Sequence, residues 1–349
     1  MKKTLVAVAA MAAVTGAMAN VTISGSLDAA YTTNTATNAA GAASSTTSVA
    51  PSGAGQSQIT FGVSEDLGNG MKAFANMRFI PDVFGAVAAP VAPATTESGG
   101  VNSDVSEVGL SGAFGTIQLE KGYGIDFMIH AAADASGWTG GSKGVVNNTS
   151  GTPGNAVVYV LPTMVQGLGV VVARGLAGGA SGNGDASVYK LTYSTGGLSV
   201  QYAGGSFSHA TTSGQSTDFG MGGTTATAAV ITIGSKTSLT GLAVTYDLGM
   251  AKLHYGSFSR KNSTDVDLKN SSNMMGVSVP FGATTVGFTS SSAKRNTLLG
   301  ATTKATGYRG KVSYALSKRT TAYGAFGTES VSGTQLKDRQ TAFGLTHSF

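Results

Sequence analysis

The chain has 349 residues, of which 51 are glycine, none is cysteine and only 11% are charged. Ordinary soluble domains contain roughly 25% charged residues, whereas the polarity here comes from Ser, Thr, Asn and Gly. This composition excludes a disulfide scaffold and cysteine-ligated zinc, and it lacks the high net charge of a disordered chain. The net charge of +5 is a weak basic excess without the concentrated basic stripe of a nucleic-acid-binding protein.

The first 19 residues have the three parts of a secretory signal peptide. Lys2 and Lys3 form a positive n-region, an apolar stretch follows from Leu5 to Val14, and Ala17-Met18-Ala19 is an A-x-A cleavage box. The apolar stretch is shorter than the roughly 20 residues of a membrane-spanning helix. We expect cleavage after Ala19 and a mature chain of residues 20–349. Loss of two lysines leaves 22 − 2 = 20 basic against 17 acidic residues, a net charge of +3.

From residue 20 onward, apolar side chains recur at every second position, which is the period of a half-buried β-strand. In residues 21–31 one face carries Val21, Ile23, Leu27 and Tyr31 and the other face is polar. The length of this segment matches the 9–11 residues of a membrane-spanning strand. The same alternation recurs near residues 58–64, 71–79, 189–193, 308–316 and 343–349.

Short and long connections also alternate along the chain. Short turns are expected near residues 65–70, 112–115, 162–167, 194–197, 247–250, 280–283 and 316–319. Long polar loops are expected near residues 32–56, 81–103, 124–154, 176–187, 209–237, 260–271, 290–303 and 329–338. Short turns on one side and long loops on the other are typical of an outer-membrane barrel. Seven turns and eight loops predict an all-β fold, a 16-stranded antiparallel transmembrane β-barrel with short periplasmic turns and long extracellular loops. Whether residues 209–237 add strand pairing is left open.

The sequence offers no convincing catalytic or metal site. Residues 140–144 fit G-x-S-x-G, but they lie in a glycine-rich loop rather than in a strand-to-helix turn. The four histidines are scattered without metal-ligand spacing, and Asp265 with Asp267 is only a weak calcium candidate. We therefore predict no enzyme activity, no cofactor and no bound metal.

Three other protein classes compete with the barrel channel. A soluble β-sandwich would need shorter loops. A sugar- or phosphate-specific channel would need an aromatic slide or a dense arginine ladder, and the chain has one Trp and seven Arg. A plugged barrel that serves as a structural or adhesive surface protein stays open as an alternative, because the long loops are rich in Ser and Thr and poor in charge.

Five segments in order along the chain resemble the general porins of Gram-negative outer membranes, most closely the beta-proteobacterial branch. These segments are Val21–Tyr31, Ser64–Phe74, Val108–Thr116, Tyr314–Thr320 and Gly344–Phe349. The resemblance implies a water-filled channel for passive diffusion of small hydrophilic solutes and ions. It also implies a homotrimer whose third loop folds into the lumen and narrows it.

In the family that the chain resembles, basic side chains of the barrel wall face acidic groups of the third loop. Residues 119–123 resemble the family's Gly-Arg-x-Tyr element, with Lys121 at the Arg position. Alternation predicts that Arg78 and Lys190 face the lumen, whereas Arg174 shares its parity with apolar residues and could belong to the wall or the rim. The candidate constriction therefore comprises Lys121, Arg78, Lys190 and Arg174 on the wall with Asp126 and Asp134 on the loop.

Two further expectations concern selectivity and partners. Val158 stands where the family often has Arg, which thins the basic ladder, and the +3 charge of the mature chain favours a weak anion preference. Phe343, Leu345 and Phe349 of the last strand resemble the family's signal for the barrel-assembly machinery. Expected partners are two further copies of the chain, outer-membrane lipid and lipopolysaccharide, the assembly machinery, and small hydrophilic solutes and ions. Nucleic acid is not expected.

Overall fold

A computed structural model describes most of the chain after residue 19. The described ranges are 20–51, 57–81, 102–122, 124–137, 155–176, 183–209, 213–216, 227–231, 235–262, 269–296 and 302–349. Residues 1–19, for which we predict a signal peptide, lie outside these ranges. So do residues 138–154 of the third loop.

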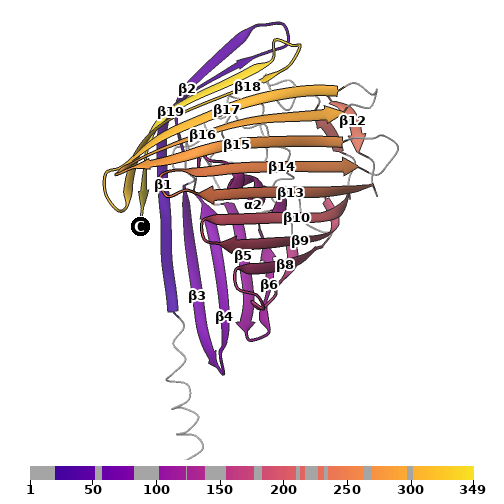
Figure 1. The fold of residues 1–349 in the computed structure, drawn as a ribbon, viewed down its shortest axis with the longest axis vertical. Coiled ribbons are helices and arrows are strands. Elements are labelled where there is room, and N and C mark those ends of the chain that lie inside the picture. Colours follow the sequence, from indigo (N-terminus) through magenta and orange to yellow (C-terminus); the bar gives the residue numbers. More distant parts are fainter. Residues whose placement is uncertain are drawn as a thin grey trace, which may run out of the picture.

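Sixteen antiparallel strands form the wall of a closed barrel (Figure 1). In chain order they are β1 (Asn20–Thr37), β3 (Gln58–Gly68), β4 (Met71–Ile80), β5 (Asn102–Gly112), β6 (Gly115–Lys121), β7 (Asn155–Val160), β8 (Leu168–Gly175), β9 (Asn183–Thr195), β10 (Leu198–His209), β13 (Lys236–Asp247), β14 (Lys252–Asn262), β15 (Lys269–Phe281), β16 (Thr284–Asn296), β17 (Thr302–Ala315), β18 (Thr320–Val331) and β19 (Lys337–Ser348). Each strand pairs with the next in this series, and β1 pairs with β19 to close the wall. The predicted 16-stranded barrel is thereby confirmed.

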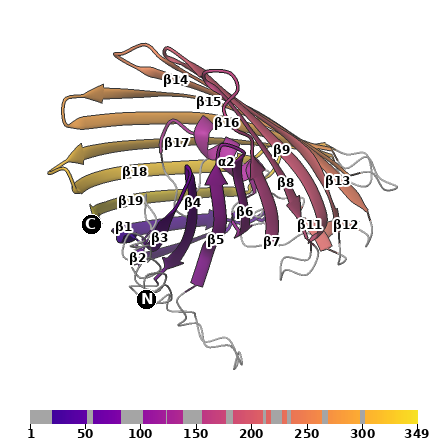
Figure 2. The same cartoon turned by 90° about the horizontal axis from the view of Figure 1, so that it is seen from below.

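Four further elements of the described chain lie within the long connections. Strand β2 (Ala43–Pro51) folds back and pairs with residues 29–37, the C-terminal half of β1. Strands β11 (Ser213–Ser216) and β12 (Thr227–Ile231) form a separate hairpin, so the stretch left open by the sequence does add strand pairing. The helix α2 (Ile125–Ala133) belongs to the third loop, and Figure 2 shows it between the two sides of the wall. In the part of the chain described, no helix is long and apolar enough to cross a membrane.

The two faces of the wall follow the alternation in the sequence. On β1 the apolar side chains of Val21 and Ile23 are 66% and 60% exposed on the outside, whereas Asp28 on the inner face is fully buried. A lipid-facing surface of apolar side chains and a polar interior are the arrangement expected of a transmembrane barrel. Pairing every backbone N–H and C=O within a closed wall is also what the hydrocarbon environment demands.

A buried polar cluster joins the first and last strands. Tyr323 and Thr346 donate hydrogen bonds of 2.8 and 2.6 Å to the Asp28 carboxylate. The Ser57 hydroxyl accepts from the Asp28 amide and donates to the Asp28 carbonyl. Gly25 and Phe349 exchange two backbone hydrogen bonds, and a Cβ at Gly25 would lie 2.7 Å from the Phe349 ring. The cluster therefore fixes the closure of the barrel.

Candidate functional site

The described part of the third loop, residues 124–137, enters the barrel and lies against one side of its inner wall. Helix α2 contacts β13, β14 and β10. Its residues Ile129 and Ala133 are fully buried in an apolar cluster with Ala203, Ala243, Phe258 and Met274 of the wall. These wall residues are small or apolar at positions that would otherwise face water, and this sequence feature is what lets the helix pack there.

Glycines of the inner wall bring the loop close to the strands. We call Gly256, Gly276 and Gly287, on β14, β15 and β16, the glycine seat. A Cβ at Gly256 would lie 2.6 Å from the Cβ of Ala133, and one at Gly276 would lie 2.5 Å from the Cβ of Ala135. A Cβ at Gly287 would collide with the Ala135 carbonyl oxygen. Since real Cβ atoms do not approach so closely, any side chain at these positions would displace the loop.

An ion pair fixes the loop just beyond the helix. Arg309 on β17 donates a 2.6 Å hydrogen bond to the Asp134 carboxylate, and both side chains are only 7% exposed. Thr289 and Ser136 donate to the same carboxylate at 2.6 and 2.8 Å. Lys311, two residues along β17, donates to the Gly137 carbonyl oxygen at 2.7 Å. The loop is therefore held by β16 and β17 as well as by the glycine seat.

The charge of Asp134 is stabilised despite its burial. Burial by itself would raise the pKa of this carboxyl group, because the charged form loses hydration. The Arg309 charge and the hydrogen bonds from Thr289 and Ser136 outweigh that effect, and the pKa of Asp134 is lowered below its usual value. Asp134 is thus an ionised anchor, and Arg309 neutralises its charge.

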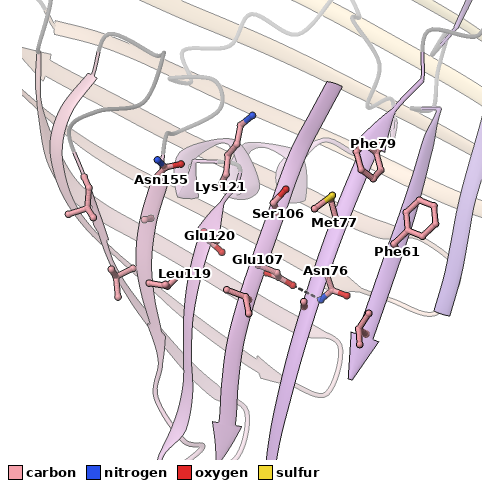
Figure 3. A pocket seen from close by; sticks show the side chains of 16 residues that line it. Phe61, Asn76, Met77, Phe79, Ser106, Glu107, Leu119, Glu120, Lys121 and Asn155 are labelled. Carbon is pink, nitrogen blue, oxygen red and sulfur yellow. Dashed lines mark hydrogen bonds between the residues drawn. The ribbon is translucent and has the colours of Figure 1, made fainter. Parts of the chain in front are cut away.

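The opposite wall carries charges that the described part of the loop does not cover. On β5 and β6 we define a carboxylate belt made of Glu107, Gln118 and Glu120. Asn76 donates to Glu107 at 2.7 Å (Figure 3), and Gln118 donates to Glu107 at 3.1 Å and to Glu120 at 2.6 Å. The amide donors order the two carboxylates without adding positive charge, and of the two it is Glu120 that lies near Lys190.

A pocket of about 710 Å³ adjoins this region on β3–β7 (Figure 3). Its lining combines outward-facing apolar side chains such as Phe61, Met77 and Leu119 with Asn76 and Glu107 of the inner face. The lining is apolar for the most part, as expected of a lipid-facing surface, and we assign no ligand to it.

The structure separates the predicted basic residues into two groups. Arg78 and Lys190 have the parity of the inner face, and Lys190 lies near enough to Glu120 for charge attraction. Lys121, at the end of β6, instead shares the outward parity of Leu119. Arg174 shares the outer face with Val172 and forms a 2.5 Å ion pair with Asp185. A role for Lys121 or Arg174 in a constriction stays a prediction. It rests on the sequence and not on the positions of these side chains in the structure.

The other predicted site residues are also placed. Asp134 is the anchor described above. Asp126 lies in α2, but its side chain is outside the described residues. Val158, where the family often has Arg, is a buried residue of the inner wall. Phe343, Leu345 and Phe349 are exposed on the outer surface. A role for them in assembly stays a prediction.

Sequence reasoning missed four inner-wall residues that matter here: Arg309, Lys311, Glu107 and Glu120. Alternation does place them on the polar face of their strands, so the face could have been predicted. Their partners could not, because Asp134 and Arg309 are 175 residues apart. Within the described ranges, no group of three or more His, Asp or Glu side chains could hold a metal ion.

Comparison with known proteins gives the family. Residues 5–334 match the model of the Gram-negative porin family. A comparison with curated proteins finds no match. Among solved structures, the chain is similar to an anion-selective porin from Comamonas acidovorans, with 20% identity, a TM-score of 0.73, and coverage of 95% of this chain and 100% of that one.

Two further structures share the fold at lower identity. The trimer form of OmpT from Vibrio cholerae is 14% identical, with a TM-score of 0.69 and coverage of 95% and 99% of the two chains. OmpF from Salmonella typhi, in complex with daunomycin, is 16% identical, with a TM-score of 0.66 and coverage of 94% and 97%. With a 16-stranded barrel and a family match over most of its length, the chain belongs to the Gram-negative porins, the non-enzymatic channels of the outer membrane.

Proposed function

We propose that this porin is an open diffusion channel for small hydrophilic solutes and ions. The observation that carries the proposal is the attachment of the third loop to one wall. The glycine seat, the apolar cluster around Ile129 and the Asp134–Arg309 pair all hold the loop against β13–β17. Residues 124–137 of the loop, fixed to one side, narrow a barrel of this size without filling it. Discrimination among solutes would then depend mainly on size.

A weak preference for anions is part of the proposal. The described side chains of the inner face are balanced in charge, with eight basic and eight acidic residues. The basic side chains are Lys72, Arg78, Lys190, Lys252, Arg260, Arg295, Arg309 and Lys311; the acidic ones are Asp28, Asp66, Glu107, Glu120, Asp134, Asp247, Glu329 and Asp338. The proposed preference therefore rests on the net charge of +3 of residues 20–349, and the carboxylate belt opposes it. Charges that line a water-filled pore act on permeating ions at close range.

We also propose that the channel is a homotrimer. One of the solved structures that share its fold is described as a trimer form. The proposal is tested by the mass of the detergent-solubilised protein, measured by light scattering with the detergent contribution subtracted. A mass of one chain would contradict it.

The deciding experiment is single-channel recording from the purified protein in a planar bilayer with a salt gradient. An open trimer predicts large ohmic openings that insert in steps of three, and a small zero-current voltage of the sign given by anion preference. A cation-preferring voltage would remove the selectivity proposal and keep the channel. Absence of conductance from folded, heat-modifiable protein would favour the alternative, a plugged barrel with a structural or adhesive role.

A further inference from the structure

Helix α2 is apolar along almost its whole length. Among its nine residues, only Asp126 and His130 are polar. Ile129 and Ala133, which are one turn apart, are fully buried against the wall. A helix that is apolar all round is normally buried on every side, whereas α2 rests on the wall with one side, chiefly on β13 and β14.

The side of α2 that faces away from the wall is apolar and borders the lumen. Because successive residues of a helix are turned by about 100°, Phe127 and Ala131 lie opposite Ile129, and Met128 lies beside them. Phe127 is half-buried, Ala131 is exposed and Met128 is 46% exposed. We call Phe127, Met128 and Ala131 the lumenal ledge. The ion pair of Asp134 and the glycine seat hold this ledge in place.

The lumenal ledge faces the carboxylate belt across the barrel. In the closed ring of strands that starts with β1, β4 and β5 are third and fourth, and β14 and β15 of the glycine seat are eleventh and twelfth. The two pairs of strands are 11 − 3 = 8 places apart, which is half of the ring. Their heights also agree, since Gly256 lies four residues after the start of β14 at a short turn, and Asn76 lies five residues after the start of β4 at another. A solute at this level passes between the ledge and the belt.

The facing wall offers charges of both signs at short range. Asn76 and Gln118 orient the carboxylates of Glu107 and Glu120. Lys190 on β9 lies near enough to Glu120 for charge attraction. An ammonium group and a carboxylate group of one small molecule would each meet an opposite charge there. An apolar surface combined with a few placed polar groups is the usual composition of a small-molecule site.

We propose that this level of the lumen is a subsite for zwitterions that carry an apolar side chain, the chemistry of an apolar amino acid. The apolar side chain lies on the lumenal ledge, and the charged groups lie at Glu107, Glu120 and Lys190. The inference rests on the proposed open channel and names a solute class for it. Weak binding inside a pore favours entry while the solute can still leave, so apolar zwitterions pass faster than polar ones of the same size.

The test compares leucine with asparagine, two zwitterions of nearly the same size, by the swelling rate of proteoliposomes that contain the purified protein. A contact that removes roughly 40 Å² of apolar surface from water favours leucine about fivefold. Met128→Gln replaces the thioether by an amide and removes about half of that surface, so the ratio of the two rates should fall to about twofold. Met128→Leu keeps the apolar surface and the helix propensity and should keep the ratio.

The matched control is Met250→Gln, the same substitution in a short turn, where Met250 is 78% exposed. It should leave the ratio of leucine to asparagine unchanged. Arabinose, an uncharged sugar of similar size, reports on the charged wall. Glu107→Gln/Glu120→Gln should lower the rate of asparagine relative to arabinose and leave the ratio of leucine to asparagine as it is in the original protein.

Three outcomes would overturn the subsite alone. They are equal rates for leucine and asparagine in the original protein, a ratio that Met128→Gln and Met250→Gln change equally, and an unchanged rate of asparagine relative to arabinose in Glu107→Gln/Glu120→Gln. Absence of swelling with every solute, arabinose included, would overturn the open channel itself and the subsite with it.

Discussion

The two sides of the barrel use the same alternation of side chains for different purposes. On the β13–β17 side, the inner face holds the third loop through glycines, a small apolar cluster and the neutralised pair Asp134–Arg309. On the β4–β9 side, the inner face carries Arg78, Lys190 and the carboxylate belt, whereas helix α2 packs chiefly on β13 and β14. From this contrast we expect a lumen-facing charge to act on permeating ions where no group of the loop neutralises it.

The largest expected effect comes from breaking the anchor on the first side. Arg309→Met leaves the Asp134 carboxylate buried without its cation, and breaking a buried ion pair in this way typically costs 3–5 kcal/mol. We expect a clear drop in the urea midpoint of the detergent-solubilised protein. Asp134→Asn/Arg309→Met should recover part of that loss, whereas Lys190→Met on the other wall should change the midpoint little. A double variant no better than Arg309→Met would contradict the anchor.

The glycine seat gives the next largest effect. In Gly276→Ala the new Cβ would lie 2.5 Å from the Cβ of Ala135, and overpacking of this kind costs about 1–3 kcal/mol unless the loop moves away. We expect lower thermal stability together with a smaller and noisier single-channel conductance, since a displaced loop enters the lumen. Gly324→Ala is the matched control, because its Cβ would meet Phe343 only at an ordinary 3.4 Å. Equal thermal stability and equal conductance of the two variants would contradict the role of the glycine seat.

The anchor also predicts a dependence of stability on acid. Because the pKa of Asp134 is lower in the folded protein than its ordinary 3.8, its charged form stabilises the fold above that value. This contribution is lost as the pH falls through the folded pKa. Urea midpoints measured from neutral pH down to below pH 3.8 should therefore fall less steeply for Asp134→Asn than for the original protein. Parallel pH profiles for the two proteins would show that Asp134 is not the titrating anchor.

The smallest expected effect concerns selectivity on the second side. Glu107→Gln/Glu120→Gln removes the negative charge of the carboxylate belt and should move the zero-current voltage toward anions. Asp134→Asn/Arg309→Met removes one charge of each sign from a neutralised pair and should leave the voltage nearly unchanged. If the second variant shifted the voltage more than the first, the division between loop-engaged and lumen-exposed charge would be wrong.

Alternation and connection lengths were enough to predict the strands of the wall, because in a transmembrane barrel each residue faces either lipid or the interior. They failed where pairing lies within a loop. Strand β2 is made of Ala, Ser, Thr, Val and Pro. It is held to β1 by polar contacts such as the hydrogen bond between Thr33 and Thr47, so its sequence lacks the alternation of apolar residues that predicts a strand. Ile117 and Leu119 already indicate outward parity for Lys121 in the sequence, so alternation and the family resemblance disagree at this residue. The role of Asp134 depends on Arg309, which no local pattern connects to it.

The central claim, that the third loop is fixed to the β13–β17 side, can be tested most directly by a distance measurement between spin labels. The chain has no native cysteine, so labels can be placed cleanly at Met128→Cys, on the exposed side of α2, and at Lys72→Cys, on the facing wall. Electron–electron double resonance in nanodiscs should give one narrow distance distribution, which broadens when Arg309→Met is added. A broad or multiple distribution in the protein with Arg309 intact would contradict a fixed loop.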